Sequence, residues 1–400
     1  MIVPERSGAD VGHDDGVRTV TDAERRSRLA VRHALAPGFQ VDSPEAVTEA
    51  LTVLHATEPP SPYLSCRARM PSPQTADLDR ALYDDRTLVK QLAMRRTLFV
   101  FPRDLLPAAW PSISARVAAT ERARMVRDVV RTGLTADGDA WLDAAREQVL
   151  AVLASAPEGL QAAQIRESVP HLAVKVTASP GEIWSGPRVL TQLGASGEIV
   201  RGRNAGRWAT SRPRWTLTGH WLGEAAPAMS PAEGYRHLVR RWLFSFGPGT
   251  EADLVWWLGS TKTVVRKALL ELGAVSVALE DGSPAWLLPD DLDEVPDPGP
   301  WTALLPVLDP TVMGWQGRGF YLGPHKERLF DTRGNAGTSA WVNGRMVGCW
   351  VQDESGRVEV RLVEDVPPAA RKALDVEASR LTAWMDGVQI RTVYKSPAMK

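Results

Sequence analysis

The chain has 400 residues, 44% of them hydrophobic, and a formal net charge of −1. That length allows roughly two to four domains, each with a hydrophobic core. The near-zero charge excludes a protein that binds nucleic acid through a global basic excess. Only 8 of the 47 basic residues are lysine. Arginine is the better ligand for phosphates and base edges, although a GC-rich genome explains the bias more simply.

The sequence also limits the compartment and the cofactors. Cys66 and Cys349 lie too far apart to suggest a redox pair, so we expect a reducing compartment. The 7 histidines include no close pair, which argues against a metal site. No Walker or dinucleotide fingerprint occurs, so we expect no nucleotide cofactor. Without a membrane-length apolar run or a signal-peptide pattern, the protein is expected to be a cytoplasmic monomer that does not contact a membrane.

The first predicted domain, residues 21–135, follows a tail at residues 1–20 that we expect to be disordered. A capping box of Thr21 and Glu24 opens its first helix. Ser43 caps a second helix, which ends before a Pro-Pro pair. An extended segment, a third helix and a basic strand are predicted at 63–69, 75–93 and 94–102. Three helices followed by basic strands are the order of a winged helix-turn-helix.

The second predicted domain, residues 136–225, repeats this order. Two helices are separated by Pro157-Glu158-Gly159, and a third helix leads into two strands joined at Asn204-Ala205-Gly206. The hairpin interleaves tryptophans with arginines: Arg201, Arg203, Arg207, Arg212 and Arg214. A wing that lies along a DNA backbone has this composition, so we predict that all of them except Arg201 bind DNA.

The third predicted domain, residues 226–285, is a looser copy. Its second helix begins after Gly249-Thr250. Lys262, Arg266 and Lys267 fall on its predicted recognition helix. Three divergent copies of one unit indicate a tandem arrangement.

Short strands and turns replace the helices in the last predicted domain, residues 286–400. Asn343-Gly344 and Ser355-Gly356 are strong hairpin-turn signals. One helix at 367–385 precedes a final strand at 388–394. We therefore predict an α+β fold, with tandem winged helix-turn-helix domains and a small β-barrel-like domain at the C-terminus.

Four segments carry a resemblance to a known family: "LHATEPPSPYLSCRAR", "MRRTLFVFP", "LLPVLDPTVMGW" and "GRMVGCWV". With the order of elements above, the chain resembles the tandem winged-helix DNA glycosylases typified by AlkZ and YcaQ, over about Thr21 to Tyr394. In that family a helix runs into a Gln-aliphatic-Gln or Gln-aliphatic-Asp triplet, followed by a proline and later by Ala-Arg. This chain has His55-Ala56-Thr57 at the matching place, which departs from the family at both polar positions.

The resemblance implies hydrolysis of the N-glycosidic bond of bulky N7-alkylated purines in double-stranded DNA. The family's substrates include crosslinks made by DNA-alkylating natural products. Such an activity would serve a producer's self-resistance or general repair. Alkylation at N7 makes the purine cationic and a good leaving group. The enzyme must then mainly position a water and stabilise an oxocarbenium-like sugar.

The triplet and its neighbour supply groups for that task. His55 can accept a proton from the water near neutral pH, because an unperturbed histidine has a pKa of ~6.5. Thr57 can hydrogen-bond the same water, and Glu58 can supply the carboxylate that the triplet lacks. The alternative is a plain helix end, since the helix dipole favours a histidine there and Thr-Glu before Pro-Pro is an ordinary exit.

Three further arginines are candidates for DNA contact. Arg95 and Arg96 lie at the first predicted wing. Arg318 lies in a glycine-flanked loop, where the backbone can approach a ligand closely. The structural alternatives are solvated strand residues and a barrel corner.

We expect water rather than an amine to be the nucleophile. A glycosylase that also nicks the strand needs a lysine that attacks C1′. The lysine nearest to His55 in sequence is Lys90, which we expect on the far side of a helix. Two other functions are alternatives: a non-catalytic winged-helix DNA-binding protein, and a protein that sequesters a genotoxic small molecule.

Overall fold

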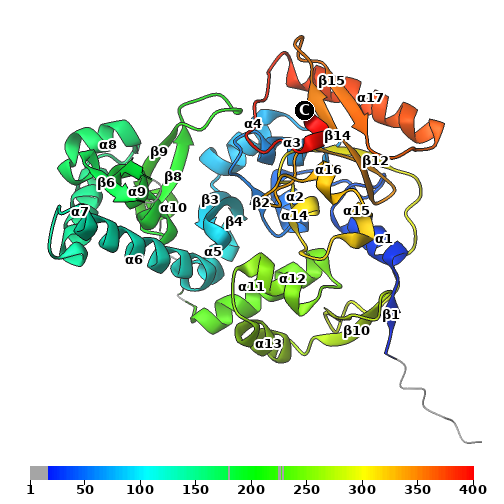
Figure 1. The fold of residues 1–400 in the computed structure, drawn as a ribbon, viewed down its shortest axis with the longest axis horizontal. Helices are drawn as coiled ribbons and strands as arrows, with labels where there is room; N and C mark the ends of the chain where they lie inside the picture. Colours follow the sequence, from blue (N-terminus) through cyan, green and yellow to red (C-terminus); the bar gives the residue numbers. More distant parts are fainter. Residues whose placement is uncertain (1–16, 179–180, 224–226, 228) are drawn as a thin grey trace, which may run out of the picture.

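The computed structural model describes residues 17–178, 181–223, 227 and 229–400 (Figure 1). Most of the predicted tail, residues 1–16, lies outside the described residues. Thr19–Val20, however, forms strand β1, which pairs in parallel with β10 at Val275–Leu279. The tail prediction was therefore wrong for its last residues, which extend the sheet of the third segment.

The first segment contains α1 (Asp22–Arg32), α2 (Pro44–Ala50), β2 (Leu54–His55), α3 (Ser61–Arg67), α4 (Thr75–Asp79), a π-helical turn (Arg80–Asp84), β3 (Leu88–Ala93) and β4 (Thr97–Pro102). The sheet order is β2-β4-β3. Thr21 and Ser43 cap α1 and α2, and each side chain accepts a hydrogen bond from a backbone N–H of the first turn.

Three predictions in this segment were wrong. Leu54–His55 is a strand rather than a helix end, because Thr52 has a φ of 65° that turns the chain after α2. Ser61–Arg67 is a helix rather than an extended segment, with a proline in its first turn, where a missing N–H is tolerated. Leu88–Ala93 is a strand, because Arg86 has a φ of 55° that ends the preceding helix.

The second segment contains α7 (Gly138–Ala154), β5 (Leu160–Gln161), α8 (Ala162–Ser168), β6 (Lys175–Ala178), β7 (Gly181–Trp184), α9 (Ser185–Ala195), β8 (Ile199–Asn204) and β9 (Pro213–Leu217). Its sheet order, β5-β9-β8, repeats that of the first segment. The β6–β7 hairpin was not predicted. The segment is joined to the first one by α5 and α6, Leu106–Ala109 and Ala115–Arg131 (Figure 1).

The third segment contains α10 (Thr218–Leu222), α11 (Pro231–Phe246), α12 (Glu251–Leu258), α13 (Lys262–Glu271), β10 (Val275–Leu279) and β11 (Pro284–Leu287). A single bridge between Gly249 and Trp286 stands where the other segments have their first strand. One order of elements therefore occurs in all three segments, with the first strand beside the last.

The last segment contains β12 (Thr302–Leu305), α14 (Pro310–Met313), α15 (Gly319–Leu322), α16 (Lys326–Leu329), β13 (Ser339–Val342), β14 (Arg345–Gln352), β15 (Val358–Leu362) and α17 (Pro368–Met385). The fold is mixed α+β, as predicted. The β-barrel prediction was wrong: the sheet is open, in the order β12-β13-β14-β15, and no pairing in the described part of the chain closes it. Both predicted hairpin turns are present.

The predicted final strand was also wrong. Residues 388–394 are not assigned to a strand, and the backbone N–H of Ile390 donates to the Gln352 side chain instead of to a neighbouring strand. None of the described helices has the length and apolar character needed to cross a membrane.

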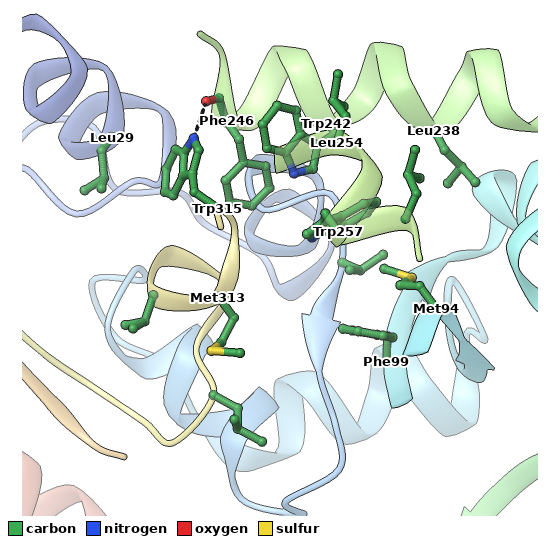
Figure 2. Packing of buried hydrophobic residues seen from close by; sticks show 14 of the residues in the cluster. Leu29, Met94, Phe99, Leu238, Trp242, Phe246, Leu254, Trp257, Met313 and Trp315 are labelled. Atoms are coloured by element: carbon green, nitrogen blue, oxygen red, sulfur yellow. Dashed lines mark hydrogen bonds between the residues drawn. The ribbon is translucent and has the colours of Figure 1, made fainter. Parts of the chain in front are cut away.

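One hydrophobic cluster joins the first, third and last segments. Figure 2 shows its centre, where Trp242 stacks on Phe246 with ring centroids 5.5 Å apart. The indole Nε1 of Trp315 donates to the Phe246 carbonyl at 3.1 Å. The second segment packs around a separate core that runs from Met125 to Trp215. The site side chains described below therefore sit on a frame made by three segments of the chain.

A buried ion pair ties the first segment to the last. Arg69 and Asp309 are both 0% exposed, and the guanidinium binds both carboxylate oxygens, at 2.7 and 3.0 Å. The other N–H groups of Arg69 donate to the carbonyls of His33 and Ser65 and to the Thr311 hydroxyl. Burial alone would raise the pKa of Asp309, but Arg69 and hydrogen bonds from Ser65 and Thr311 outweigh it and the pKa is lowered.

We predict that Arg69→Met lowers the free energy of unfolding by about 3–5 kcal/mol, because it leaves a buried carboxylate without its partner. Urea denaturation at pH 7 measures the loss. Arg80→Met is the matched control, since Arg80 and Asp85 form a half-exposed pair, and it should cost less than about 1 kcal/mol. Similar losses in the two variants would contradict the anchoring role of Arg69.

Candidate functional site

His55 is held in the first segment's sheet. β2 pairs with β4 so that His55 lies opposite Phe99, and the two rings meet edge to face with centroids 5.1 Å apart. The side chain is 6% exposed. Lys90 lies on β3 in register with Val100 and Leu54, and therefore on the opposite face of the sheet from His55. The helix prediction for Lys90 was wrong, but its separation from His55 was expected.

The protonation state of His55 follows from its surroundings. Its pKa is lowered to about 3, mainly because the ring is buried. The nearby Arg95 guanidinium also lowers the pKa, and this effect is larger than the opposite effect of Asp309. The imidazole is therefore neutral at pH 7. The backbone N–H of Thr57 points at Nδ1, 3.4 Å away, which favours the tautomer with the proton on Nε2. His55 is thus better suited to donate a hydrogen bond than to accept a proton.

A cavity of about 470 Å³ opens beside His55. It is lined by His55, Arg95, Thr97, Trp256, Met313, Gln316, Arg318, Lys326, Arg333, Gly334 and Asn335. The lining includes four cationic side chains and, among the described residues that form it, no acidic one. The cavity is therefore built for an anionic group, such as a phosphate, near a neutral histidine.

Arg95 is placed by an unusual turn. Arg95 and Arg96, at the tip of the β3–β4 hairpin, have φ values of 56° and 58°, a conformation that glycine or asparagine normally supplies in such turns. The Arg95 guanidinium lies 4.0 Å from the centroid of the Trp256 ring, and Arg318 lies 5.1 Å from the same ring. Desolvation, with a smaller contribution from Arg318, lowers the pKa of Arg95 to about 10. Strained, stacked arginines of this kind are typical of functional sites.

The structure brings only part of the predicted catalytic group into this cavity. Thr57 is exposed and Glu58 is half-buried, and neither belongs to the lining. Burial raises the pKa of Glu58, and hydrogen bonds from the Val393 backbone and the Thr392 hydroxyl partly offset this. Glu58 therefore faces the C-terminal residues, while His55 faces the cavity.

The wing of the second segment folds back onto the protein. Trp208 at its tip packs against Tyr63 and Trp384, with ring centroids 5.6 and 5.4 Å apart. Arg203 forms an ion pair with Asp84. Arg214 donates to the carbonyl of Gly159, whereas Arg207 and Arg212 are exposed. The predicted DNA-binding wing thus has internal contacts that DNA would have to replace or leave in place.

The loop that carries Arg318 is fixed from the third segment. The carboxylate of Asp253, 1% exposed, accepts hydrogen bonds from the backbone N–H groups of Gln316 and Gly317, both at 2.8 Å. Its other oxygen bonds the N–H and hydroxyl of Thr250 in the capping box of α12. Asp253 therefore sets the height of the loop against Trp256 on the same helix.

A sequence profile described as "DNA glycosylase AlkZ-like" matches residues 48–384. The chain belongs to the AlkZ-like DNA glycosylase family. Among solved structures, the Streptomyces sahachiroi DNA glycosylase AlkZ matches with a TM-score of 0.72 and 21% sequence identity, over 92% of this chain and 99% of that chain. At that identity the match shows the shared fold. No curated protein matches the chain.

Within this AlkZ-like chain, the sequence missed several cavity residues: Trp256, Gln316, Lys326, Arg333 and Asn335. Gln316 lies two residues before Arg318, so the glycine-flanked loop was a usable signal. Arg333 and Asn335 flank Gly334 between α16 and β13, and no sequence motif singled them out. Trp256 packs against the core, and its side chain also lines the cavity.

We predict that Asp253→Ala frees the 316–317 amides and accelerates their hydrogen exchange by about tenfold or more, the effect of losing a buried hydrogen-bond acceptor. Asp253→Asn should exchange more slowly at residues 316–317 than Asp253→Ala, because its amide oxygen can still accept both bonds, although its NH2 cannot accept the Thr250 N–H. Exchange mass spectrometry measures this, with strand β14 as the internal reference. Wild-type exchange at residues 316–317 in Asp253→Ala would show that another contact holds the loop.

Proposed function

We propose that this protein is a monofunctional DNA glycosylase that hydrolyses the N-glycosidic bond of bulky N7-alkylated purines, chiefly guanine, in double-stranded DNA. It would act as a cytoplasmic monomer with water as the nucleophile. The observation that carries the proposal is the cavity that joins His55 to Arg95 and Arg318 in an AlkZ-like chain. Self-resistance to a DNA-alkylating natural product and general repair are the two settings for such an activity.

We also propose that the first three segments are winged helices. Each has a helix, a short strand or bridge, two helices and a hairpin, with the first strand beside the last. This is the order of a winged helix-turn-helix unit, in which DNA is held by a helix or by the hairpin. The tandem supports a long protein surface for one duplex.

The site's charge suits this reaction better than a reaction that needs an acid. An N7-alkylated purine already carries a positive charge, so its departure needs no proton from the enzyme. The Trp256 ring already contacts two planar cations, the guanidinium groups of Arg95 and Arg318, and a cationic purine that displaced one of them would be a planar cation of the same kind. The remaining cations can hold the phosphates beside the lesion. Those phosphates enter with the substrate and then offset the charge of the sugar transition state.

His55 would act by orienting the water rather than by deprotonating it. With a pKa of about 3 it is a weak base, and an oxocarbenium-like sugar is electrophilic enough to be attacked by neutral water. The Nε2–H can donate to the water oxygen. Asn335 can accept a hydrogen bond from the water, because its amide nitrogen donates to Asp331 and its carbonyl oxygen is left as an acceptor. After the water oxygen bonds to C1′, the surplus proton is released to bulk solvent. These amide and imidazole groups would replace the paired Gln side chains of the family triplet.

We predict that His55→Phe lowers single-turnover excision by ~10²–10³-fold, the range for the loss of one positioned hydrogen-bond donor. His55→Gln should keep activity within about tenfold of wild type, because its amide restores an N–H donor. DNA affinity should change little in both variants. Equal losses in the Phe and Gln variants would show that a ring nitrogen, rather than a donor, is needed.

The rate should not depend on His55 ionisation between pH 5 and 8. With a folded pKa of about 3, His55 stays neutral throughout this range. A base of ordinary pKa would make excision fall as the pH drops below ~6.5. Single-turnover rates on DNA with a defined N7-alkylguanine measure the profile. A fall with a midpoint near 6.5 would restore the general-base role of His55.

Excision assays across a DNA panel, from N7-methylguanine to bulky natural-product adducts, test the proposed function. We expect abasic sites that break only after alkali or heat. Borohydride trapping tests the nucleophile, with Lys326→Ala as the informative variant, because Lys326 lines the cavity although it is remote in sequence. Lys326 is exposed, whereas lysine nucleophiles are commonly desolvated. A trapped adduct that Lys326→Ala abolishes would overturn the water mechanism.

A further inference from the structure

The long helix α6 carries an exposed row of arginines that the site does not include. It holds five arginines against one glutamate and one aspartate. At about 100° per residue, four of them project within a sector of roughly 80°: Arg116, Arg124, Arg127 and Arg131. All four are exposed, and Arg124 and Arg131 are each 54% exposed. The fifth, Arg122, points elsewhere and pairs with Asp139 and Asp143 of α7.

The two acids of α6 do not cancel this row. Glu121 is 4% exposed and is shared by Arg124 and Arg96. Asp128 is shared by Arg131 and the buried Arg188. Arg116 and Arg127 have no ion-pair partner among the described residues. Because each buried carboxylate is shared by two arginines, it holds their side chains in place but neutralises only half of their charge. The exposed face of the row therefore stays positive.

The row continues from the cavity. Arg95 and Arg96 are neighbours at the tip of the β3–β4 hairpin, and the turn sends their side chains apart. Arg95 enters the cavity over Trp256, while Arg96 reaches Glu121 of α6. Arg96 therefore bridges the cavity and Arg124, and it is itself 51% exposed. Figure 1 shows α6 running outward from α5, near the first segment, to α7 in the second.

The helices that precede the three hairpins are less suited to a DNA groove. In the first segment this helix and its π-helical turn carry Asp77, Asp79 and Asp84. In the second segment, α9 is buried along almost its whole length. In the third segment, α13 is exposed, but its basic residues pair with Glu251 and Glu271. In all three segments, the helix before the hairpin is therefore poorly suited to lie in a DNA groove, the usual contact of a winged helix.

We propose that the exposed face of α6, defined by Arg116, Arg124, Arg127 and Arg131, binds the phosphate backbone of the duplex on one side of the lesion. The row is about 22 Å long at ~1.5 Å per residue, long enough for its four guanidinium groups to contact separate phosphates of one strand. Arg96 carries the backbone from α6 to the cavity. This inference rests on the proposed function only in taking double-stranded DNA as the ligand.

Salt-dependent binding of an undamaged duplex by Arg116→Gln/Arg127→Gln tests the proposal. Two lost phosphate contacts should reduce the slope of log affinity against log salt by about 1.8, at ~0.9 per contact. Between 50 and 200 mM salt, wild type should therefore lose affinity roughly tenfold more than the variant. Fluorescence anisotropy gives the slopes, and circular dichroism confirms that the exposed substitutions leave the fold intact.

Arg122→Gln is the matched control, since it removes the same charge from the same helix but outside the row, and its slope should equal that of wild type. An unchanged slope in the double variant overturns the proposal, as does an equal fall in the control. The proposed function fails separately: wild type would then bind DNA with the expected slope and excise nothing from the panel. Absence of salt-dependent binding by wild type would overturn both.

Discussion

The bidentate contact between Arg69 and Asp309 is the interaction on which the rest of this architecture depends. It joins two motif segments that are far apart in sequence, and both side chains are completely buried. Asp309 also caps α14 through the N–H of Thr311, and α14 leads directly into the loop that carries Gln316 and Arg318. All five N–H groups of Arg69 have acceptors within the protein. A buried pair of this kind contributes to the position of the chain segments it joins more than to net stability. Here it positions α14 and the following loop, which lines the cavity.

Local signals in the sequence predicted most helices, caps and hairpin turns, because those depend on near neighbours. Asn343 and Gly344, with φ values of 47° and 79°, occupy their turn for the reason the sequence suggested. The failures occurred where backbone turns had no such signal, as at Thr52 and Arg86, whose positive φ values are rare for these residue types. His55 was identified from its motif, but its strand position was not. The cavity could not be predicted, because its lining combines residues from 55 to 335 that only tertiary packing brings together.

The structure redistributes the predicted DNA-binding arginines. Sequence pattern favoured the second wing, where tryptophans and arginines alternate, and the structure uses part of that pattern internally. Trp208 docks on Tyr63 and Trp384, and Arg203 pairs with Asp84. Exposed ion pairs of this kind contribute little, so DNA can compete for Arg203 at small cost. The docked tip, in contrast, sets where the second segment lies against the first, and α6 spans the same two segments. The second segment would then serve mainly to hold the duplex at a fixed angle to the cavity.

The charge of the cavity bears on how the proposed excision could proceed in a chain that departs from the family triplet at both polar positions. The four cations that line the cavity, with no carboxylate in the described lining, would oppose a cationic base in the free protein. Burial is the main reason that the pKa values of Arg95 and His55 are lowered, and a neighbouring arginine adds to each shift. A duplex changes that balance, because each phosphate bound to Arg95, Arg318 or the α6 row neutralises one of them. The site would then become favourable for an oxocarbenium-like sugar only after DNA is seated. A neutral His55 fits this order of events, since a protonated imidazole would add a fifth cation where the positive charge develops. In the proposed mechanism, the low basicity of His55 therefore avoids an added charge at the reacting sugar.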